Sequence, residues 1–371
     1  MHFSRGMTES LRRQVVVPPH VSAIYLGAGL AMLAVGIALV VGARGAQVTP
    51  VMPDAPLAEI APPSLVAAPR TAVAASEDAA PIADEIKLMF RAGDASYVRI
   101  SDIERDAAGA LAWPRHAAPR LLEEDGAEVA IAAVADADVP ARHRAWVGRQ
   151  VIVDGTCRAT VTGFAVVSRL LGDPGYAGIE KDAWDVAAVM QAGAPVLAAR
   201  LDRCSGTYAR DAALAPVVIP APIQDERLAA SARSALIASS VGAEMARRWA
   251  ELGSQAATGA WWDHAQLVTR VLRHPRTSAV LVAVHAYTDF ECGGPDINVW
   301  GLYRAAADGT LTPVHERKLD ALRSIEKIID VEGDGALELI GRSWLGNNLL
   351  LTAADGSEID HLDMQFYGCP C

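Results

Sequence analysis

The sequence has 371 residues, of which 51% are hydrophobic, and its formal net charge is −11. This length and apolar content are enough for a membrane segment and two domains with cores of their own. A surface this acidic repels phosphate backbones, which argues against nucleic acid as a partner.

The N-terminal segment predicts a membrane anchor. Residues 21–43 are 23 almost entirely apolar or small residues, which is long enough to cross ~30 Å of hydrocarbon as a helix. Three Arg precede this run and only Arg44 follows it closely, so the positive-inside rule places residues 1–20 in the cytoplasm and the rest outside. A cleaved signal peptide is the alternative, since residues 41–43 could form a cleavage site. Both alternatives export the main body, and we expect it on the periplasmic side of the inner membrane.

Residues 44–84 predict a tether. They hold seven Pro and many Ala, with little aromatic content. Such a stretch cannot bury enough apolar surface to fold alone, and its Pro residues keep it extended. It would space the folded part from the bilayer.

Residues 85–225 predict a β-rich domain. Segments rich in Val and Ile, several of them alternating with polar residues, are typical of strands. They are Tyr97–Ile100, Glu128–Val134, Gln150–Val153, Cys157–Leu170, Pro195–Leu201 and Leu214–Ile219. Asp154-Gly155 is a tight-turn signal, and Asp182–Ala192 predicts a short helix. A small, partly open barrel or sandwich of five or six strands fits this pattern best.

A single helix is expected next. Apolar residues recur at spacings of three to five from Ile223 to Glu251, which leaves an imperfect apolar stripe. Gly253 is a plausible C-terminal cap. We interpret residues 226–255 as a connecting helix between two domains.

Residues 256–371 predict an antiparallel β-meander, which makes the whole chain mainly β. Strands of similar length are separated by Asp-Gly turns, which suggests stacked four-stranded units. The expected strands are Gln266–Leu272, Ala279–Tyr287, Ile297–Arg304, Leu311–Val314, Ile325–Asp330, Leu337–Ile340, Leu349–Thr352 and Ile359–Met364.

Residues 330–338 carry the most chemical information. They read Asp-Val-Glu-Gly-Asp-Gly-Ala-Leu-Glu between two expected strands. Gly333 and Gly335 tolerate positive φ, so the loop can turn sharply and bring its carboxylates together. Clustered carboxylate oxygens plus a backbone carbonyl are what Ca²⁺ prefers. Gly341 stands where an EF-hand has its bidentate Glu, and a solvated acidic turn without an ion is the alternative.

This strand–loop–strand pattern resembles the calcium loop of FG-GAP and VCBS repeats, the units of integrin-α-like β-propellers. Residues 349–357 resemble the last hairpin of such a blade, so the resemblance covers roughly the last 45 residues. It implies blade-like units and a calcium ion as cofactor. Glu332 departs from the pattern, where Asp is usual. The ligands that the resemblance implies are Asp330, Glu332, Asp334, Glu338 and the carbonyl of Ala336.

All five cysteines lie on the side expected to be exported, where disulfides persist. Cys157 and Cys204 share the first domain and are candidates for a pair. Cys292 could bond either Cys369 or Cys371, which leaves one thiol over.

No catalytic residue is predicted, because neither a His-Glu-x-x-His nor a Gly-x-Ser-x-Gly pattern is present. His285 and Tyr287 would lie on the same face of a strand, with Asp289 just beyond its end. Together these three side chains could line a polar pocket. We expect a membrane-anchored extracytoplasmic binding or scaffold protein, stabilised by calcium, with an envelope protein or a glycan as partner. The alternative is a periplasmic hydrolase whose residues converge only on folding. A sensor is disfavoured, because residues 1–20 hold no signalling domain.

Overall fold

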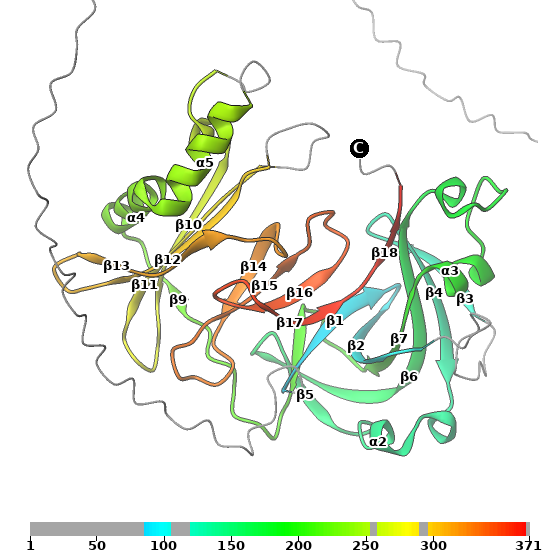
Figure 1. Cartoon of the computed structure of the whole chain (residues 1–371). Helices are drawn as coiled ribbons and strands as arrows, with labels where there is room; N and C mark the ends of the chain where they lie inside the picture. The colour runs from blue at the N-terminus through cyan, green and yellow to red at the C-terminus, as the bar shows by residue number, and fades with distance from the viewer. Residues whose placement is uncertain (1–84, 105–118, 253–257, 289–295, 369–371) are drawn as a thin grey trace, which may run out of the picture. The chain divides into compact units, whose positions relative to one another are not determined.

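The computed structural model describes residues 85–104, 119–252, 258–288 and 296–368 (Figure 1). The expected tail, membrane span and tether lie outside these ranges, as do Gly253, Asp289, Cys292, Cys369 and Cys371. No helix among the described residues is long and apolar enough to cross a membrane. All the described residues belong to one compact unit. Their fold is mainly β, as predicted, with three sheets.

The first sheet contains a closed ring of strands. Its members are β1 (Ile86–Ala92), β2 (Ala95–Asp102), β3 (Arg120–Glu124), β4 (Ala127–Val134), β5 (Gln150–Val153), β6 (Cys157–Gly172), β7 (Ala194–Leu201), β8 (Tyr208–Asp211) and β18 (Gln365–Tyr367). Pairing runs β6–β5–β8–β1–β2–β7 and returns from β7 to β6, so six strands close a small barrel. The β3–β4 hairpin extends the sheet from β6, and β18 pairs in parallel with β6.

The alternation along β6 explains its two environments. Phe164, Val166 and Leu170 point into the barrel core. Ala165 and Val167 point to the outer face, which is also buried. Successive side chains of a strand point to opposite faces, so a strand covered on both sides is apolar throughout.

The turn between β5 and β6 is the one that the sequence predicts. Asp154 and Gly155 have φ of 48° and 74°. Two successive residues with positive φ are typical of the type I′ hairpin turn, which Asp-Gly favours. By contrast, Leu214–Ile219 is not a strand and forms only an isolated bridge between Val218 and Asp330. Pro216 and Pro220 flank that bridge and cannot donate to a ladder.

The expected single helix is in fact two helices, α4 (Glu226–Ala238) and α5 (Ser240–Glu251). Ser239 has extended backbone angles and ends α4, and its hydroxyl accepts a hydrogen bond from the Gly242 N–H at 3.1 Å to begin α5. A Cβ on Gly242 would lie 2.4 Å from the Leu236 and Ile237 carbonyl oxygens, so only Gly allows so tight a junction. Both helices pack their apolar residues on the second sheet.

The second and third sheets are antiparallel meanders. The second is formed by β9 (Ala221–Pro222), β10 (Gln266–Arg273), β11 (Val280–Tyr287), β12 (Asn298–Ala305) and β13 (Leu311–Lys318). The third is formed by β14 (Ser324–Ile329), β15 (Glu338–Arg342), β16 (Leu349–Ala353) and β17 (Glu358–Leu362). Each strand predicted in this region is present, with shifts of a few residues at the ends. The remaining short helices of the described residues are η1 (Asp136–Asp138), α2 (Ala141–Arg144), η2 (Pro174–Ala177), α3 (Val186–Ala192) and η4 (Trp261–Asp263).

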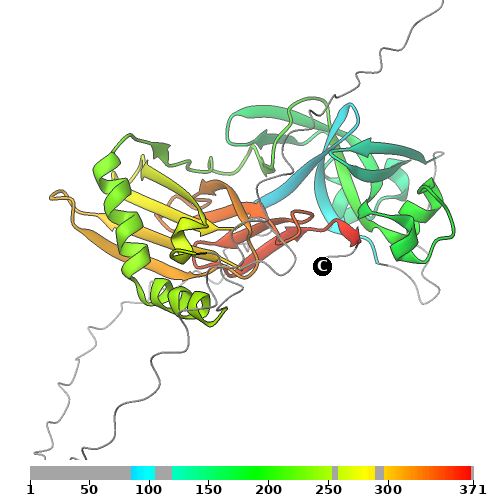
Figure 2. The same ribbon diagram turned by 90° about the horizontal axis from the view of Figure 1, so that it is seen from above.

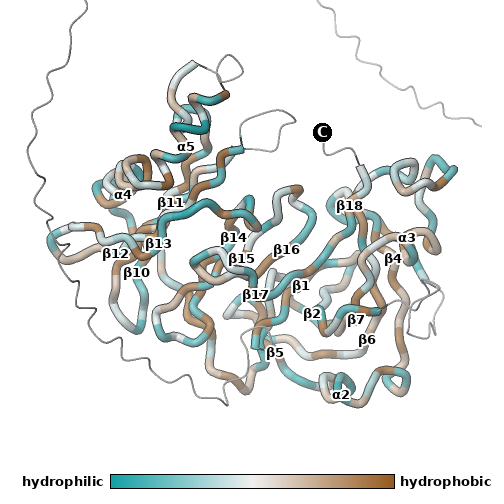
Figure 3. The backbone as a smooth tube through the Cα atoms, in the orientation of Figure 1, coloured by the Kyte–Doolittle hydropathy of each residue, from teal (hydrophilic) through white to brown (hydrophobic). Residues whose placement is uncertain are grey.

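The third sheet lies between two apolar layers. Leu339 and Leu350 pack against the second sheet, whereas Ile340, Leu349 and Leu351 pack against the outer face of the barrel. Figure 2 shows the resulting order of helices, second sheet, third sheet and barrel. Apolar colour accordingly follows many of the strands in Figure 3, with polar colour on α5.

Candidate functional site

The acidic loop, residues 330–338, joins β14 to β15. Its first residue, Asp330, holds the loop closed by accepting hydrogen bonds, a role that we call a clasp. Asp330 is fully buried, and its Oδ2 accepts hydrogen bonds from His274 Nε2 at 2.8 Å and from the Gly335 N–H at 2.7 Å. Its Oδ1 accepts from the Gly333 N–H. The other ring nitrogen of His274 accepts from the Thr277 N–H at 3.1 Å, so Nε2 carries the hydrogen that it donates to Asp330. The carboxylate is therefore occupied by protein donors.

The other four predicted ligands have different surroundings. Glu332, Asp334 and Ala336 are exposed, and the Asp334 Oδ1 accepts a hydrogen bond from the Ala336 N–H at 2.8 Å. Glu338 is buried and accepts from the Val331 N–H at 2.9 Å. Burial, with a contribution from the neighbouring carboxylates of the loop, raises the pKa of Glu338 to about 7. No group of three or more His, Cys, Asp or Glu in the described ranges is placed to hold a metal ion, and the calcium site stays a prediction.

The predicted pairing of Cys157 with Cys204 is confirmed. The two residues form a disulfide that joins β6 to the turn after β7, with their Cα atoms 6.0 Å apart. This bond closes a loop with a sequence separation of 47.

A cavity of about 330 Å³ lies between the outer face of the barrel and the third sheet. Residues of β1, β4, β6, the β3–β4 hairpin and the β7–β8 connection line one side. They include Phe90, Arg169 and the acidic residues Glu124 and Asp125. Residues from β15 to β17 and their connections line the other side, among them Arg342, Asn347 and Met364.

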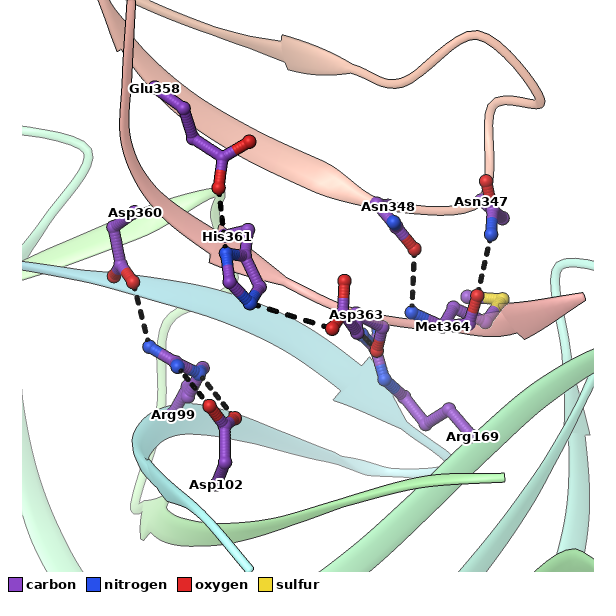
Figure 4. Close-up of polar contacts among 10 residues, drawn as sticks. All are labelled: Arg99, Asp102, Arg169, Asn347, Asn348, Glu358, Asp360, His361, Asp363 and Met364. Carbon is purple, nitrogen blue, oxygen red and sulfur yellow. Dashed lines mark hydrogen bonds and ion pairs between the residues drawn. The ribbon is translucent and has the colours of Figure 1, made fainter. Parts of the chain in front are cut away.

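Arg169 is the unusual side chain in this cavity. It follows Ala165 and Val167 on the outer face of β6, where the pattern calls for another apolar residue, and it is only 5% exposed. Its Nη2 donates to the carbonyl of Asp363 at 2.8 Å (Figure 4), and its guanidinium lies 4.6 Å from the centre of the Phe90 ring. Its buried Nε has no hydrogen-bond partner in the described part of the protein.

The charge of Arg169 is not neutralised by a contacting carboxylate. Within the described ranges no ion pair joins Arg169 to Asp or Glu, and the Asp363 carboxylate instead lies 3.5 Å from His361 Nε2. Burial and, to a smaller extent, the nearby charge of Arg342 lower the pKa of Arg169 to about 9, although the negative charge of Asp363 acts in the opposite direction. A pKa near 9 still leaves the guanidinium protonated at neutral pH. Arg342 itself donates to Glu326 at 2.8 Å and is partly exposed.

The wall opposite Arg169 is held in place by amide side chains. Asn347 donates from Nδ2 to the Met364 carbonyl at 2.6 Å, and the Met364 N–H donates to the Asn348 Oδ1 at 2.8 Å (Figure 4). Between β17 and the barrel, Arg99 Nη1 contacts Asp360 at 2.9 Å. These contacts fix the connection between β17 and β18, which bounds the cavity.

The arrangement can bind an anion. A guanidinium presents donors in a planar fork that matches carboxylate and phosphate oxygens, and Arg169 and Arg342 both line the cavity. Of the two acidic residues that also line it, Glu124 pairs with Arg91 at 3.7 Å. Arg169 was not among the site residues predicted from the sequence. The available signal was a single charged residue in the apolar run of residues 164–171, because charged residues are almost never fully buried unless paired.

Family models, curated proteins and solved structures give no match to this chain. The resemblance of the last strands to FG-GAP and VCBS repeats therefore stays a prediction.

Proposed function

We propose that this chain is a membrane-anchored, extracytoplasmic binding protein whose ligand carries a carboxylate or phosphate group, and that the Arg169 cavity is its binding site. The observation that supports this proposal is a protonated guanidinium, almost fully buried, without a contacting carboxylate. Taking such a charge out of water costs several kcal/mol unless a counter-charge and hydrogen bonds offset it. An anionic ligand group would supply both.

The ligand would also have an apolar part. Leu349, Leu362 and Met364 line the cavity beside the two Arg side chains. A volume of about 330 Å³ lies within the ~300–1,000 Å³ that small-molecule sites occupy. An anionic group on Arg169 and an apolar body against these three side chains would fill the space with complementary chemistry.

Export and anchoring rest on separate observations. The disulfide between Cys157 and Cys204 supports an oxidising compartment, and residues 21–43 supply the proposed anchor. A C-terminal fusion to alkaline phosphatase, which is active only outside the cytoplasm, should be active in cells. An inactive fusion would contradict the proposed location. Calcium in the acidic loop and an envelope or glycan partner remain parts of the proposal.

Binding can be tested by calorimetric titration of the purified full chain with benzoate, benzamide and inorganic phosphate at constant ionic strength. Benzamide has the shape of benzoate without its charge. We expect saturable binding of benzoate, with or without phosphate, and binding of benzamide at least about tenfold weaker. Equal affinities for benzoate and benzamide would contradict a role for the guanidinium.

Two variants and one control separate this site from a purely structural Arg169. Arg169→Met should abolish benzoate binding, and Arg342→Met should weaken it several-fold without removing the hydrogen bond to Asp363. Arg203→Met makes the same charge change at an exposed position and should leave binding unchanged. If Arg342→Met binds benzoate like the unmodified chain and Arg169→Met only lowers stability, Arg169 is a structural tie and the proposal fails.

A periplasmic hydrolase is the second candidate, because a pocket does hold His285. Burial lowers the pKa of His285 to about 4, which keeps the ring neutral but makes it a weak base at neutral pH. This property favours binding over hydrolysis. Hydrolysis of p-nitrophenyl acetate by the full chain, lost in His285→Gln, would support the hydrolase instead.

A further inference from the structure

We propose that a second pocket, on the face of β10–β12 opposite α4 and α5, binds a small hydroxycarboxylate of the size of glycolate. The pocket has a volume of about 100 Å³ and is independent of the Arg169 cavity. Arg270, His285, Tyr287 and Trp300 line it, and Ile325 of β14 closes its other side.

The strand register explains why a hollow forms here. Arg270 lies opposite Ala283, and Ala283 lies opposite Leu302, so one small side chain separates two large ones. In the next row of the same face, His285 lies opposite Trp300, with the ring centroids 6.4 Å apart. Cross-strand neighbours on one face are close enough to pack, so the missing volume at Ala283 leaves a pocket with aromatic walls.

The hydrogen bonds around His285 fix its tautomer. Asn298 donates from Nδ2 to the carbonyls of Leu319 at 2.5 Å and Leu322 at 2.7 Å. Its Oδ1 must therefore accept, and the His285 Nε2 at 2.8 Å must donate. Because burial keeps the ring neutral at physiological pH, its Nδ1 has a free lone pair that can accept a hydrogen bond.

Arg270 supplies the complementary charge. Its Nη2 donates to the Ile325 carbonyl at 2.8 Å, and its contact with the Glu326 carbonyl is 3.5 Å. In the described part of the chain, no ion pair links Arg270 to a carboxylate. Arg270 is half-buried and lines the pocket, so a ligand carboxylate can reach its guanidinium.

These groups define the ligand class. A carboxylate would pair with Arg270, and a neighbouring hydroxyl would donate to the lone pair of His285. Tyr287 stacks on His285 with a centroid distance of 4.8 Å and forms a flat wall. A volume of about 100 Å³ is several times the ~10–15 Å³ that one water requires, which suits a ligand of a few heavy atoms.

The test is calorimetric titration of the full chain with glycolate, acetate and ethylene glycol at constant ionic strength. We expect glycolate to bind about three- to tenfold more tightly than acetate, since one added hydrogen bond is worth this much. Ethylene glycol should not bind. Absence of saturable glycolate binding, or equal affinity for glycolate and acetate, would overturn the proposal.

Four variants test the two proposed contacts, that of Arg270 with the ligand carboxylate and that of His285 with the ligand hydroxyl. Arg270→Met should abolish glycolate binding, Arg270→Lys should retain part of it, and His285→Phe should make glycolate and acetate equivalent. Arg273→Met changes an exposed Arg on the same strand and should have no effect. In the unmodified chain, glycolate should also shift the ¹⁵N resonance of His285 Nδ1, a readout that does not require any variant to fold. Glycolate affinity that is unchanged in Arg270→Met overturns the proposal.

The Arg169 cavity can fail without this pocket failing. Arg169→Met should leave glycolate binding unchanged, and Arg270→Met should leave benzoate binding unchanged. If Arg169→Met abolishes glycolate binding, glycolate occupies the larger cavity and the second site is refuted.

Discussion

Replacing Asp330 by Ala should destabilise the protein strongly, whether or not calcium is present. The substitution removes the acceptor for three donors, namely His274 Nε2 and the N–H groups of Gly333 and Gly335. The side chains of Asp330 and His274 are both fully buried, so water cannot replace the bond to His274, whereas the N–H groups of Gly333 and Gly335 are half-buried. At ~1–3 kcal/mol for each buried donor left without a partner, with partial relaxation of the loop, we expect a loss of about 4 kcal/mol.

The assay is thermal unfolding of the full chain and of two variants, in excess calcium and in chelator. A loss of about 4 kcal/mol corresponds to a decrease in Tm of roughly 10 °C for a domain of this size. Asp334→Ala is the matched control, because Asp334 is exposed and, among the residues that the structure describes, accepts a hydrogen bond only from the Ala336 N–H of its own loop. That variant should lose less than about 1 kcal/mol in chelator.

The two roles of Asp330 give opposite patterns. A clasp predicts that Asp330→Ala lowers Tm equally in calcium and in chelator. A calcium ligand predicts that the difference appears only in calcium, and that Asp334→Ala then behaves like Asp330→Ala. A decrease confined to calcium would refute the clasp.

Three further predictions concern His285, the disulfide and Asp360. Burial in the folded state lowers the pKa of His285 to about 4, below its unfolded value of ~6.5. The contribution of neutral His285 to stability is therefore complete above pH ~6.5 and falls by about 3 kcal/mol as the pH decreases towards 4. Urea unfolding at several pH values should show this loss of stability, and the loss should be absent in His285→Gln. Replacing both Cys157 and Cys204 by Ser should cost about 4 kcal/mol in the unfolding free energy, since the disulfide spans 47 residues, and an unchanged urea midpoint would contradict the bond. Asp360→Ala should cost only about 1–2 kcal/mol by the same measurement, because Asp102 still pairs with Arg99 at 2.8 Å; a loss as large as that of Asp330→Ala would show that Asp102 does not compensate.

Strand positions were predictable where the pattern was local. Residues 349–352 form a run of three Leu and a Thr, and the three Leu are consecutive because the third sheet is buried on both faces. The Asp154-Gly155 turn carried its own conformational signal. The first strand, Ile86–Ala92, was missed because a Lys and an Arg interrupt its apolar pattern.

Tertiary contacts decided the features that the sequence could not show. The break at Ser239 was missed because apolar spacing continues across it, although the Ser hydroxyl begins α5. Asp330 was expected to face a cation, and only the fold brings His274 to it from 56 residues away. Arg169 could not be predicted for the same reason. Whether a carboxylate contacts its guanidinium depends on which side chains of the third sheet lie beside it in the fold.

The most direct test of the Arg169 site is a crystal structure of the full chain with p-bromobenzoate, in which the anomalous signal of bromine locates the ligand. We predict one strong bromine peak in the cavity, with the carboxylate on Arg169 and the bromine beside Leu349 and Leu362. A bromine peak elsewhere, or an empty cavity at a saturating concentration of the ligand, would contradict it.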